Sequence, residues 1–258
     1  MTRLSFYSTL TLLLIIQAVS SGEEPVSPEP NSLGMQFVTL PESRDEICIH
    51  ETRVSDFTSF ARENPDVGTA WKAVIYRGET QAPNHPVIYV NWHDAVAFCD
   101  WLGSREGRSY RLPSDAEYSA LLGLEKEEGE TPEEKGRVAG KSFPWGVDFE
   151  VPDRFGNFSS TEASVSFGWK SIAAFSDGAA FSAPVMSYRP SEHGVFDISG
   201  NAEEWTSDFY DLSELTYAVR GASWLNNSET ALRSAFRNFE EPDKRSKSIG
   251  FRVVRVAK

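Results

Sequence analysis

Residues 194–208, which read GVFDISGNAEEWTSD, carry the side chains in this chain that are best suited to chemistry. Carboxylates stand at Asp197 and Glu204 with turn-forming residues between them, and neither helix nor strand periodicity explains the mixture. Calcium takes several oxygen ligands and accepts backbone carbonyls together with carboxylates. The segment therefore predicts a structured loop that binds a hard cation, and a solvated acidic turn is the simpler alternative from spacing alone.

Six further stretches form an ordered set with this loop. The stretches are HPVIYVNWHDAVAFCDWL at 85–102, YRLPSDAEY at 110–118, FPWG at 143–146, RGASW at 220–224, RSAFR at 233–237 and IGFRVVR at 249–255. Together with the loop they resemble the motifs of the sulfatase-modifying-factor family, whose founding member is the formylglycine-generating enzyme, and the match runs from about residue 33 to the end. An ordered set is far more specific than any single motif. The resemblance implies an α+β fold with much irregular structure, of the formylglycine-generating-enzyme type, which is similar to the C-type lectin fold.

The resemblance also implies two structural calcium sites. The residues that match the first site are Asn157 and Asp177 through their side chains and Phe158 and Ala179 through their carbonyls. The residues that match the second are Asp197 and Glu204 through their side chains and Gly200 and Ala202 through their carbonyls. The second site is the better supported, because both of its side-chain carboxylates are present.

The copper chemistry of the family depends on residues that this chain lacks. The enzymes resemble copper oxidases that use oxygen to convert a sulfatase cysteine to formylglycine, and soft thiolate ligands hold Cu(I). The pattern needs two cysteines five positions apart after RGASW, and here those positions hold Asn226 and Ala231. Copper binding is therefore not expected. Ser223 matches an active-site serine, but no nearby base supports it as a nucleophile.

Two other features bear on recognition. The family has tryptophan before the signature glutamate, and Glu203 stands there, so we expect an acidic groove wall in place of an aromatic one. The basic segments 233–237 and 250–255 could form an anion site. The alternation of Arg252 with apolar neighbours is typical of a strand, and the family uses such arginines to join the C-terminal sheet to the loops. We favour that structural role.

Other metal or redox chemistry has little support. The four histidines are scattered, without the spacing of a metal cluster. Cys48 and Cys99 stand among apolar residues, and either a disulfide joins them or both are buried free thiols. The family often keeps a disulfide cysteine at the position of Cys99, but its usual partner position is Val253 here.

The N-terminus predicts export. Residues 1–20 carry Arg3, an apolar run and a small-x-small ending, which together are typical of a secretory signal peptide. An uncleaved anchor is the alternative. Residues 21–32 are rich in proline and glutamate and predict a disordered linker, followed by one domain over 33–258. A secreted or periplasmic location follows, and no later run is long enough to span a membrane.

Charge narrows the classes of partner. The formal net charge is −13, and removal of the signal peptide with Arg3 lowers it to −14. Such acidity disfavours nucleic acid and anionic membrane surfaces. A protein, a peptide or a glycan remains as the class of ligand.

The elements that must position these residues can be placed in outline. Alternation predicts strands over 34–40 and 46–52, and a helix follows with Ser55 as N-cap and its end at Pro65. Residues 86–90 look like a strand that leads into a helix with a capping box at Asn91, which Gly103 ends. A second box starts at Ser114. The sequence of residues 124–141 predicts a solvated loop. The sequence of residues 146–188 predicts few regular elements, and bound metal ions could stabilise such an irregular stretch.

Three functions follow for testing. The first is a calcium-stabilised binding module or pseudoenzyme, which the missing thiolates support. The second is a formylglycine-generating oxidoreductase, which would need another arrangement of metal ligands. The third is a distant oxidase with histidine ligands, and the chain lacks the histidine-rich domain that such enzymes carry.

Overall fold

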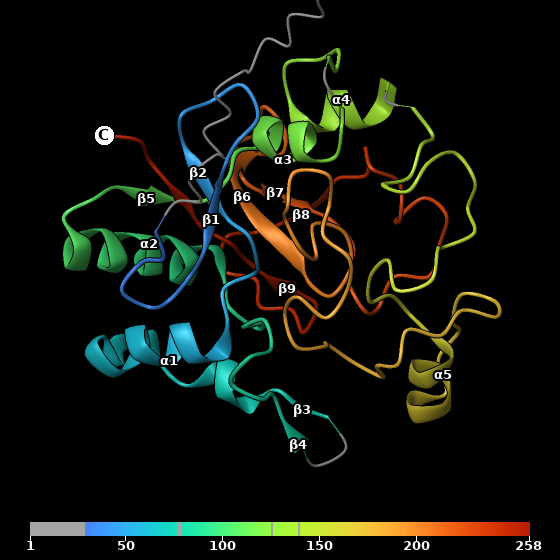
Figure 1. Cartoon of the computed structure of the whole chain (residues 1–258), viewed down its shortest axis with the longest axis horizontal. Helices are drawn as coiled ribbons and strands as arrows, with labels where there is room; N and C mark the ends of the chain where they lie inside the picture. The colour runs from blue at the N-terminus through green and yellow to red at the C-terminus, as the bar shows by residue number, and fades with distance from the viewer. Residues whose placement is uncertain (1–28, 77–78, 125, 139) are drawn as a thin grey trace, which may run out of the picture.

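The computed structural model describes residues 29–76, 79–124, 126–138 and 140–258 (Figure 1). The predicted signal peptide and most of the predicted linker lie outside these residues. Asn31 and Ser32, at the end of the linker range, are described: Ser32 Oγ donates to Glu106 Oε1 at 2.6 Å. Among the described residues, no helix has the length and apolar character needed to cross a membrane.

Two four-stranded sheets form the centre of the molecule, in the orders β1-β2-β10-β5 and β8-β7-β6-β9. The C-terminal strand β10 lies between β2 and β5 and pairs with both, so strands from both ends of the described domain share one sheet. All pairings are antiparallel except β6 with β9. The strands are β1 (Phe37–Thr39), β2 (Glu46–Cys48), β5 (Tyr110–Arg111), β6 (Glu203–Phe209), β7 (Tyr217–Arg220), β8 (Asn238–Glu240), β9 (Ile249–Gly250) and β10 (Val254–Arg255), with a separate hairpin of β3 (Ile75–Tyr76) and β4 (Glu79–Thr80).

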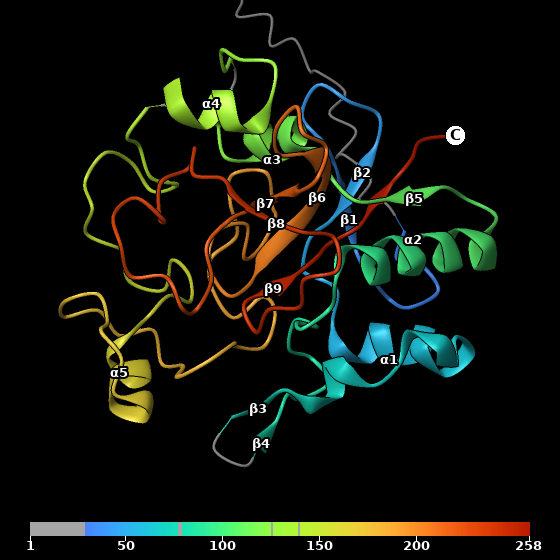
Figure 2. The ribbon, with the colours of Figure 1, turned by 180° about the vertical axis from the view of Figure 1, so that it is seen from behind.

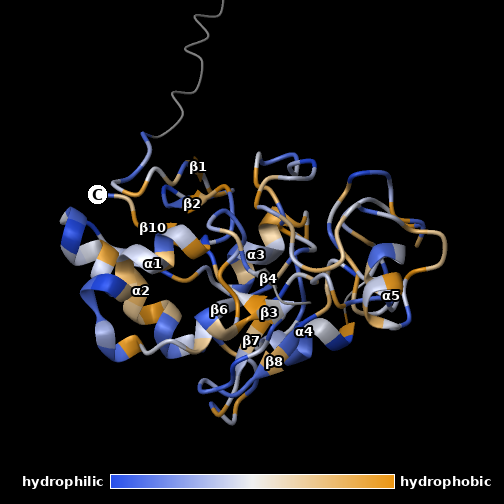
Figure 3. Ribbon diagram, turned by 90° about the horizontal axis from the view of Figure 1, so that it is seen from below, coloured by the Kyte–Doolittle hydropathy of each residue, from blue (hydrophilic) through white to orange (hydrophobic). Residues whose placement is uncertain are grey.

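Five α-helices in the described part of the chain lie around the sheets. In both Figures 1 and 2, α1 and α2 lie at one end of the molecule and α5 lies at the other. Figure 3 shows hydrophobic and hydrophilic residues alternating along α1 and α2, as expected for helices with one buried face. The helices are α1 (Val54–Glu63), α2 (Trp92–Glu106), α3 (Asp115–Leu121), α4 (Pro132–Val138) and α5 (Thr161–Phe167), with single 3-10 turns at η1 (Pro65–Val67) and η2 (Ala70–Ala73).

Both predicted capping boxes are confirmed, but one predicted helix end is wrong. Asp94 N–H donates to Asn91 Oδ1 at 2.9 Å, and Ser114 caps α3 in the same way. Helix α2 continues through Gly103 to Glu106, and its C-cap is Gly107, whose φ is 63°. A Cβ on Gly103 would lie 2.7 Å from the Arg108 carbonyl oxygen. This glycine therefore allows close packing and does not end the helix.

Three other predictions of elements need correction. Helix α1 begins at Val54, and its N-cap is Arg53, because Asp56 accepts from the Arg53 N–H at 3.0 Å. Ser55 therefore lies inside the helix. Residues 86–90 form no named strand, and only Pro86 makes an isolated bridge, to Arg53. The predicted loop 124–141 contains α4.

The main apolar core lies between the two sheets and helices α1 and α2. Phe98 is its centre, with ring centroids 6.0 Å from Phe57 and 5.4 Å from Phe251. The signature tryptophan, Trp205, is fully buried in this core, and its indole N–H donates to the Val90 carbonyl at 3.2 Å. Packing of Trp205 therefore fixes the start of β6, and with it the segment that precedes the strand.

A second anchor is ionic. The carboxylate of Asp115, at the start of α3, contacts the guanidinium groups of Arg220 and Arg237, with 2.9 Å from Asp115 Oδ1 to Arg237 Nε. All three side chains are buried. Because these arginines come from β7 and the segment before β8, the cluster fixes α3 to the second sheet.

Candidate functional site

The signature segment divides into an irregular loop, residues 197–202, and strand β6. Asp197, Gly200 and Asn201 all have positive φ, at 54°, 106° and 64°. A Cβ on Gly200 would lie 3.0 Å from both N and O of Asn157. Only glycine allows this approach without displacement, and the Asn201 N–H donates to the Asn157 carbonyl at 2.7 Å. The structure thus brings together residues from both predicted calcium sites.

One residue predicted for the second calcium site, Glu204, belongs to a buried ion pair. Both carboxylate oxygens of Glu204 accept from Arg252, at 2.6 Å each, and neither side chain is exposed. Asp197 Oδ2 accepts from the Met186 N–H at 2.8 Å. Asp197 Oδ1 is buried without a hydrogen-bond partner among the described residues. Arg252 also donates to the Phe196 carbonyl at 3.0 Å, which confirms the structural role expected for it.

Glu51 is a third carboxylate at this place, and the sequence alone did not predict it. Its side chain is fully buried, Oε1 accepts from the Ala202 N–H at 3.1 Å, and Oε2 accepts from Asn201 Nδ2 at 2.9 Å. Glu51 therefore fixes the 197–202 loop through hydrogen bonds to Asn201 and Ala202. Glu51 follows β2 in EICIHE, three positions after Cys48, and an acid next to the apolar residues of this stretch is the signal that could have found it.

The buried charges do not balance. Glu51, Asp197 and Glu204 face one cation, Arg252. Burial, reinforced by the charges of Asp197 and Glu204, raises the pKa of Glu51 well above its ordinary value. Burial also raises the pKa of Asp197 to about 6. An excess of buried carboxylate favours either proton uptake or a bound cation.

The first predicted set lies beside this cluster. Asp177 accepts from the N–H groups of Phe158 and Ala179, at 2.9 Å each, and burial raises its pKa to about 6. The Ala179 carbonyl accepts from Ser160 Oγ at 2.9 Å. Asn157 is fully buried, and its Oδ1 has no hydrogen-bond partner among the described residues.

The unpaired oxygen atoms of these loops indicate whether calcium could bind there. Two buried oxygens, Asn157 Oδ1 and Asp197 Oδ1, lack partners, and a buried polar atom without a partner is costly. Both atoms are hard oxygen donors of the kind that calcium takes. In the part of the chain that the structure describes, no group of three or more His, Cys, Asp or Glu side chains is arranged for a metal. The residues therefore fit calcium only with carbonyl and amide oxygens included.

The two positions that the resemblance aligns with the copper thiolates hold no soft ligand for copper. Asn226 Oδ1 accepts from the Ser223 N–H at 2.7 Å and from the Ser223 hydroxyl at 2.8 Å. Ser223 is fully buried. Ala231 packs against the apolar cluster around Phe143 and Phe158. The first position thus holds an amide bound to a hydroxyl group, and the second holds a methyl group in an apolar cluster.

The two cysteines lie elsewhere and are not joined. Cys48 in β2 and Cys99 in α2 are buried free thiols. Burial raises the pKa of Cys48 to about 12 and raises that of Cys99 even further. Because the thiolate is the form that binds metal, neither side chain offers a soft ligand at neutral pH.

Glu203 does not form the acidic groove wall expected from the sequence. Its side chain is 5% exposed, and Oε1 accepts from Asn238 Nδ2 at 3.1 Å. Burial raises its pKa to about 7. The expectation was wrong because Glu203 starts β6, between β7 and β9, and faces the protein interior.

Relatives of this chain include both named enzymes and a named inactive protein. The formylglycine-generating enzyme of Streptomyces coelicolor is 30% identical over 198 residues, which cover 69% of this chain and 55% of that protein. The inactive C-alpha-formylglycine-generating enzyme 2 of Bos taurus is 30% identical over 179 residues, which cover 66% of this chain and 50% of that protein. The chain thus spans about half the length of the curated relatives that it matches.

Solved structures show the same fold. PvdO from Pseudomonas aeruginosa has a TM-score of 0.60 at 19% identity and covers 87% of this chain and 92% of its own. CarF has a TM-score of 0.54 at 19% identity and covers 83% of this chain and 87% of its own. This likeness concerns the fold alone, and it confirms the expected α+β architecture.

The sequence model of the sulfatase-modifying factor enzyme 1-like domain matches residues 44–257. That range contains the signature loop and all six further stretches on which the resemblance was based. The chain belongs to the sulfatase-modifying factor enzyme 1-like domain family.

Proposed function

We propose that this chain is an exported, calcium-stabilised binding module, a member of the family without copper oxidase activity. One observation carries the proposal: Asn226 and Ala231 stand where the resemblance requires two thiolates, and the Asn226 side chain is closed onto Ser223. Family membership alone does not decide the matter, because the relatives include both enzymes and an inactive protein.

The alternative is a formylglycine-generating oxidoreductase that acts on a sulfatase cysteine. It would need two soft ligands close together, and Cys48 and Cys99 are buried thiols on separate elements. The ligand of the module is a protein, a peptide or a glycan. The charge of −13 disfavours nucleic acid.

An oxidation assay tests the proposal directly. The mature protein is incubated with Cu(I), reductant, oxygen and a peptide that contains Cys-x-Pro-x-Arg, and mass spectrometry monitors conversion of the cysteine to the aldehyde. We expect no aldehyde, because no thiolate pair holds the copper. An active formylglycine-generating enzyme serves as the positive control. Aldehyde formed by this chain would refute the proposal and support the alternative.

Calcium would be held by the two loop sets. The first comprises Asn157, Asp177 and the carbonyls of Phe158 and Ala179, and the second comprises Asp197, Glu204 and the carbonyls of Gly200 and Ala202. The bound ion would neutralise buried carboxylates and supply the partners that Asn157 Oδ1 and Asp197 Oδ1 lack. Its role is therefore stabilisation of irregular chain.

Calcium is expected to raise the melting temperature. A ligand at about 100 times its dissociation constant adds about 2.7 kcal/mol to the free energy of unfolding, which corresponds to roughly 5–10 °C for a domain of this size. Thermal unfolding is compared in calcium and in EDTA. Asp197→Asn should reduce the difference, whereas Asp243→Asn, at a carboxylate 87% exposed, should leave it unchanged. Equal melting temperatures in calcium and EDTA would show that the calcium assignment is wrong.

A further inference from the structure

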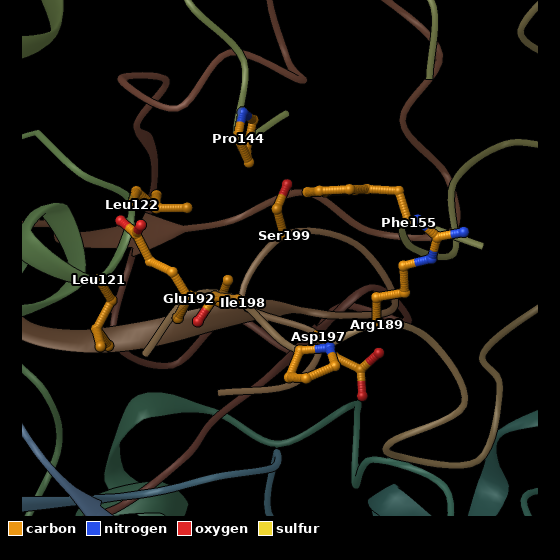
Figure 4. A pocket seen from close by; sticks show the side chains of 11 residues that line it. Leu121, Leu122, Pro144, Phe155, Arg189, Glu192, Asp197, Ile198 and Ser199 are labelled. Carbon is orange, nitrogen blue, oxygen red and sulfur yellow. The ribbon is translucent and has the colours of Figure 1, made fainter. Parts of the chain in front are cut away.

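A pocket of about 230 Å³ lies against the signature loop, and Asp197, Ile198 and Ser199 of that loop form part of its lining. Its apolar wall comes from the end of α3 and from two later loops, through Leu121, Leu122, Pro144 and Phe155. Figure 4 shows these side chains around a space whose centre faces Ser199. The volume suits one apolar side chain and is below the range usual for whole small-molecule ligands.

Two opposite charges stand at the rim. In Figure 4 the guanidinium of Arg189 lies beside Phe155, and the carboxylate of Glu192 lies across the pocket beside Leu122. Arg189 is exposed, and its side chain makes no hydrogen bond or ion pair with any other described residue. Glu192 is 79% exposed, with His193 Nε2 at 3.7 Å. Both charges are therefore available to a ligand.

The rim is fixed before any ligand arrives. The Arg189 N–H donates to the Arg154 carbonyl at 3.1 Å, and the Ser191 N–H donates to the Val195 carbonyl at 2.8 Å. Pro190, between these two residues, has a restricted backbone. A preformed rim reduces the entropy that binding must overcome.

We infer that this pocket binds an extended peptide segment in which an apolar residue enters the pocket, an acidic residue meets Arg189 and a basic residue meets Glu192. The inference rests on the proposed function and names its ligand class. A single amino acid fits less well, because its amino and carboxyl groups share one carbon while the two rim charges lie on opposite sides. In an extended chain, residues two positions apart face the same side, so the charges should stand at positions −2 and +2 from the anchor.

The test uses two acetylated, amidated peptides, Asp-Ser-Leu-Ser-Lys and Lys-Ser-Leu-Ser-Asp, and a version with glycine in place of leucine. Ligand-observed NMR with the whole protein measures the dissociation constants, which should be on the order of 1 mM. We expect one order of charges to bind about tenfold more tightly than the other, since two exposed ion pairs replace two repulsions. The glycine version should show no binding.

The decisive variant is the charge swap Arg189→Glu with Glu192→Arg. Both side chains are exposed, so the fold should be retained, and the preference between the two peptides should invert. Each single substitution should remove the preference. Arg62→Glu, at an exposed arginine of α1 away from the pocket, should leave it unchanged.

Two results would overturn the inference: no binding of either peptide, or a preference that the swap does not change. These results are independent of the oxidation assay. A chain that forms no aldehyde and binds neither peptide would retain the proposed function and lose only this site. A chain that forms aldehyde would lose the proposed function, whatever the peptides show.

Discussion

Replacement of Arg252 by methionine is expected to lower the free energy of unfolding by about 3–5 kcal/mol. The substitution removes both hydrogen bonds to Glu204, at 2.6 Å each, and the bond to the Phe196 carbonyl at 3.0 Å. It leaves Glu204 buried with Glu51 and Asp197, without a cation among the four side chains. Because burial already raises the pKa values of Glu51 and Asp197, a third buried carboxylate without its partner would be strongly destabilising.

Urea unfolding in EDTA measures this loss, since calcium could replace part of the missing positive charge. Arg105→Met is the matched control. Arg105 also pairs with a carboxylate, that of Glu63, but the two side chains are 41% and 52% exposed, and the loss should stay below about 1 kcal/mol. If the two variants lost the same small amount, the Glu204–Arg252 pair would not be the anchor of the signature loop.

Local signals in the sequence predicted the parts of the fold that depend on neighbouring residues. The capping boxes at Asn91 and Ser114 mark α2 and α3 correctly, because the N-cap and the residue three positions later are close in any helix. Gly103 misled the prediction for the end of α2. A glycine that ends a helix and one that allows close approach look the same in sequence, and the contact with Arg108 becomes visible only in the fold.

The candidate site depends on contacts between distant segments. Glu51 meets the loop at Asn201 and Ala202, and Glu204 meets Arg252, across separations of 150 and 48 residues. Helix and strand periodicity in the sequence reports only local relations and does not indicate such distant pairs. The family resemblance placed Asp197 and Glu204 in one loop, but it could not show that Glu204 is already bound by an arginine or that the charges are unbalanced.

Glu203 shows the same limit at a single residue. The sequence indicated that an acid replaces an aromatic residue in a groove wall, because the resemblance supplies a position and not its degree of burial. In the structure the side chain is 5% exposed, and it accepts a hydrogen bond from Asn238 and another from Ser248. An acid that was expected to line a groove is thus buried, and it makes stability depend on pH.

Replacement of Glu203 by glutamine is expected to stabilise the protein at high pH and to have little effect at low pH. Burial raises the pKa of Glu203 from 4.5 to about 7 in the folded chain. The native state therefore holds this proton more tightly than the unfolded state, and stability falls as the pH rises from about 4.5 through about 7. Glutamine cannot ionise, keeps an oxygen for Asn238 and removes this loss, which the pKa difference puts at about 3 kcal/mol.

Urea unfolding of both proteins between pH 4.5 and pH 8 tests this argument. The difference in unfolding free energy between the two proteins should grow through that range and level off above pH 7.5. Glu241→Gln, at an exposed carboxylate directly after β8, is the control and should show no such trend. A gain that is constant with pH would indicate better packing of the amide. A loss at pH 8 would show that the ionised carboxylate of Glu203 has a partner that outweighs its burial.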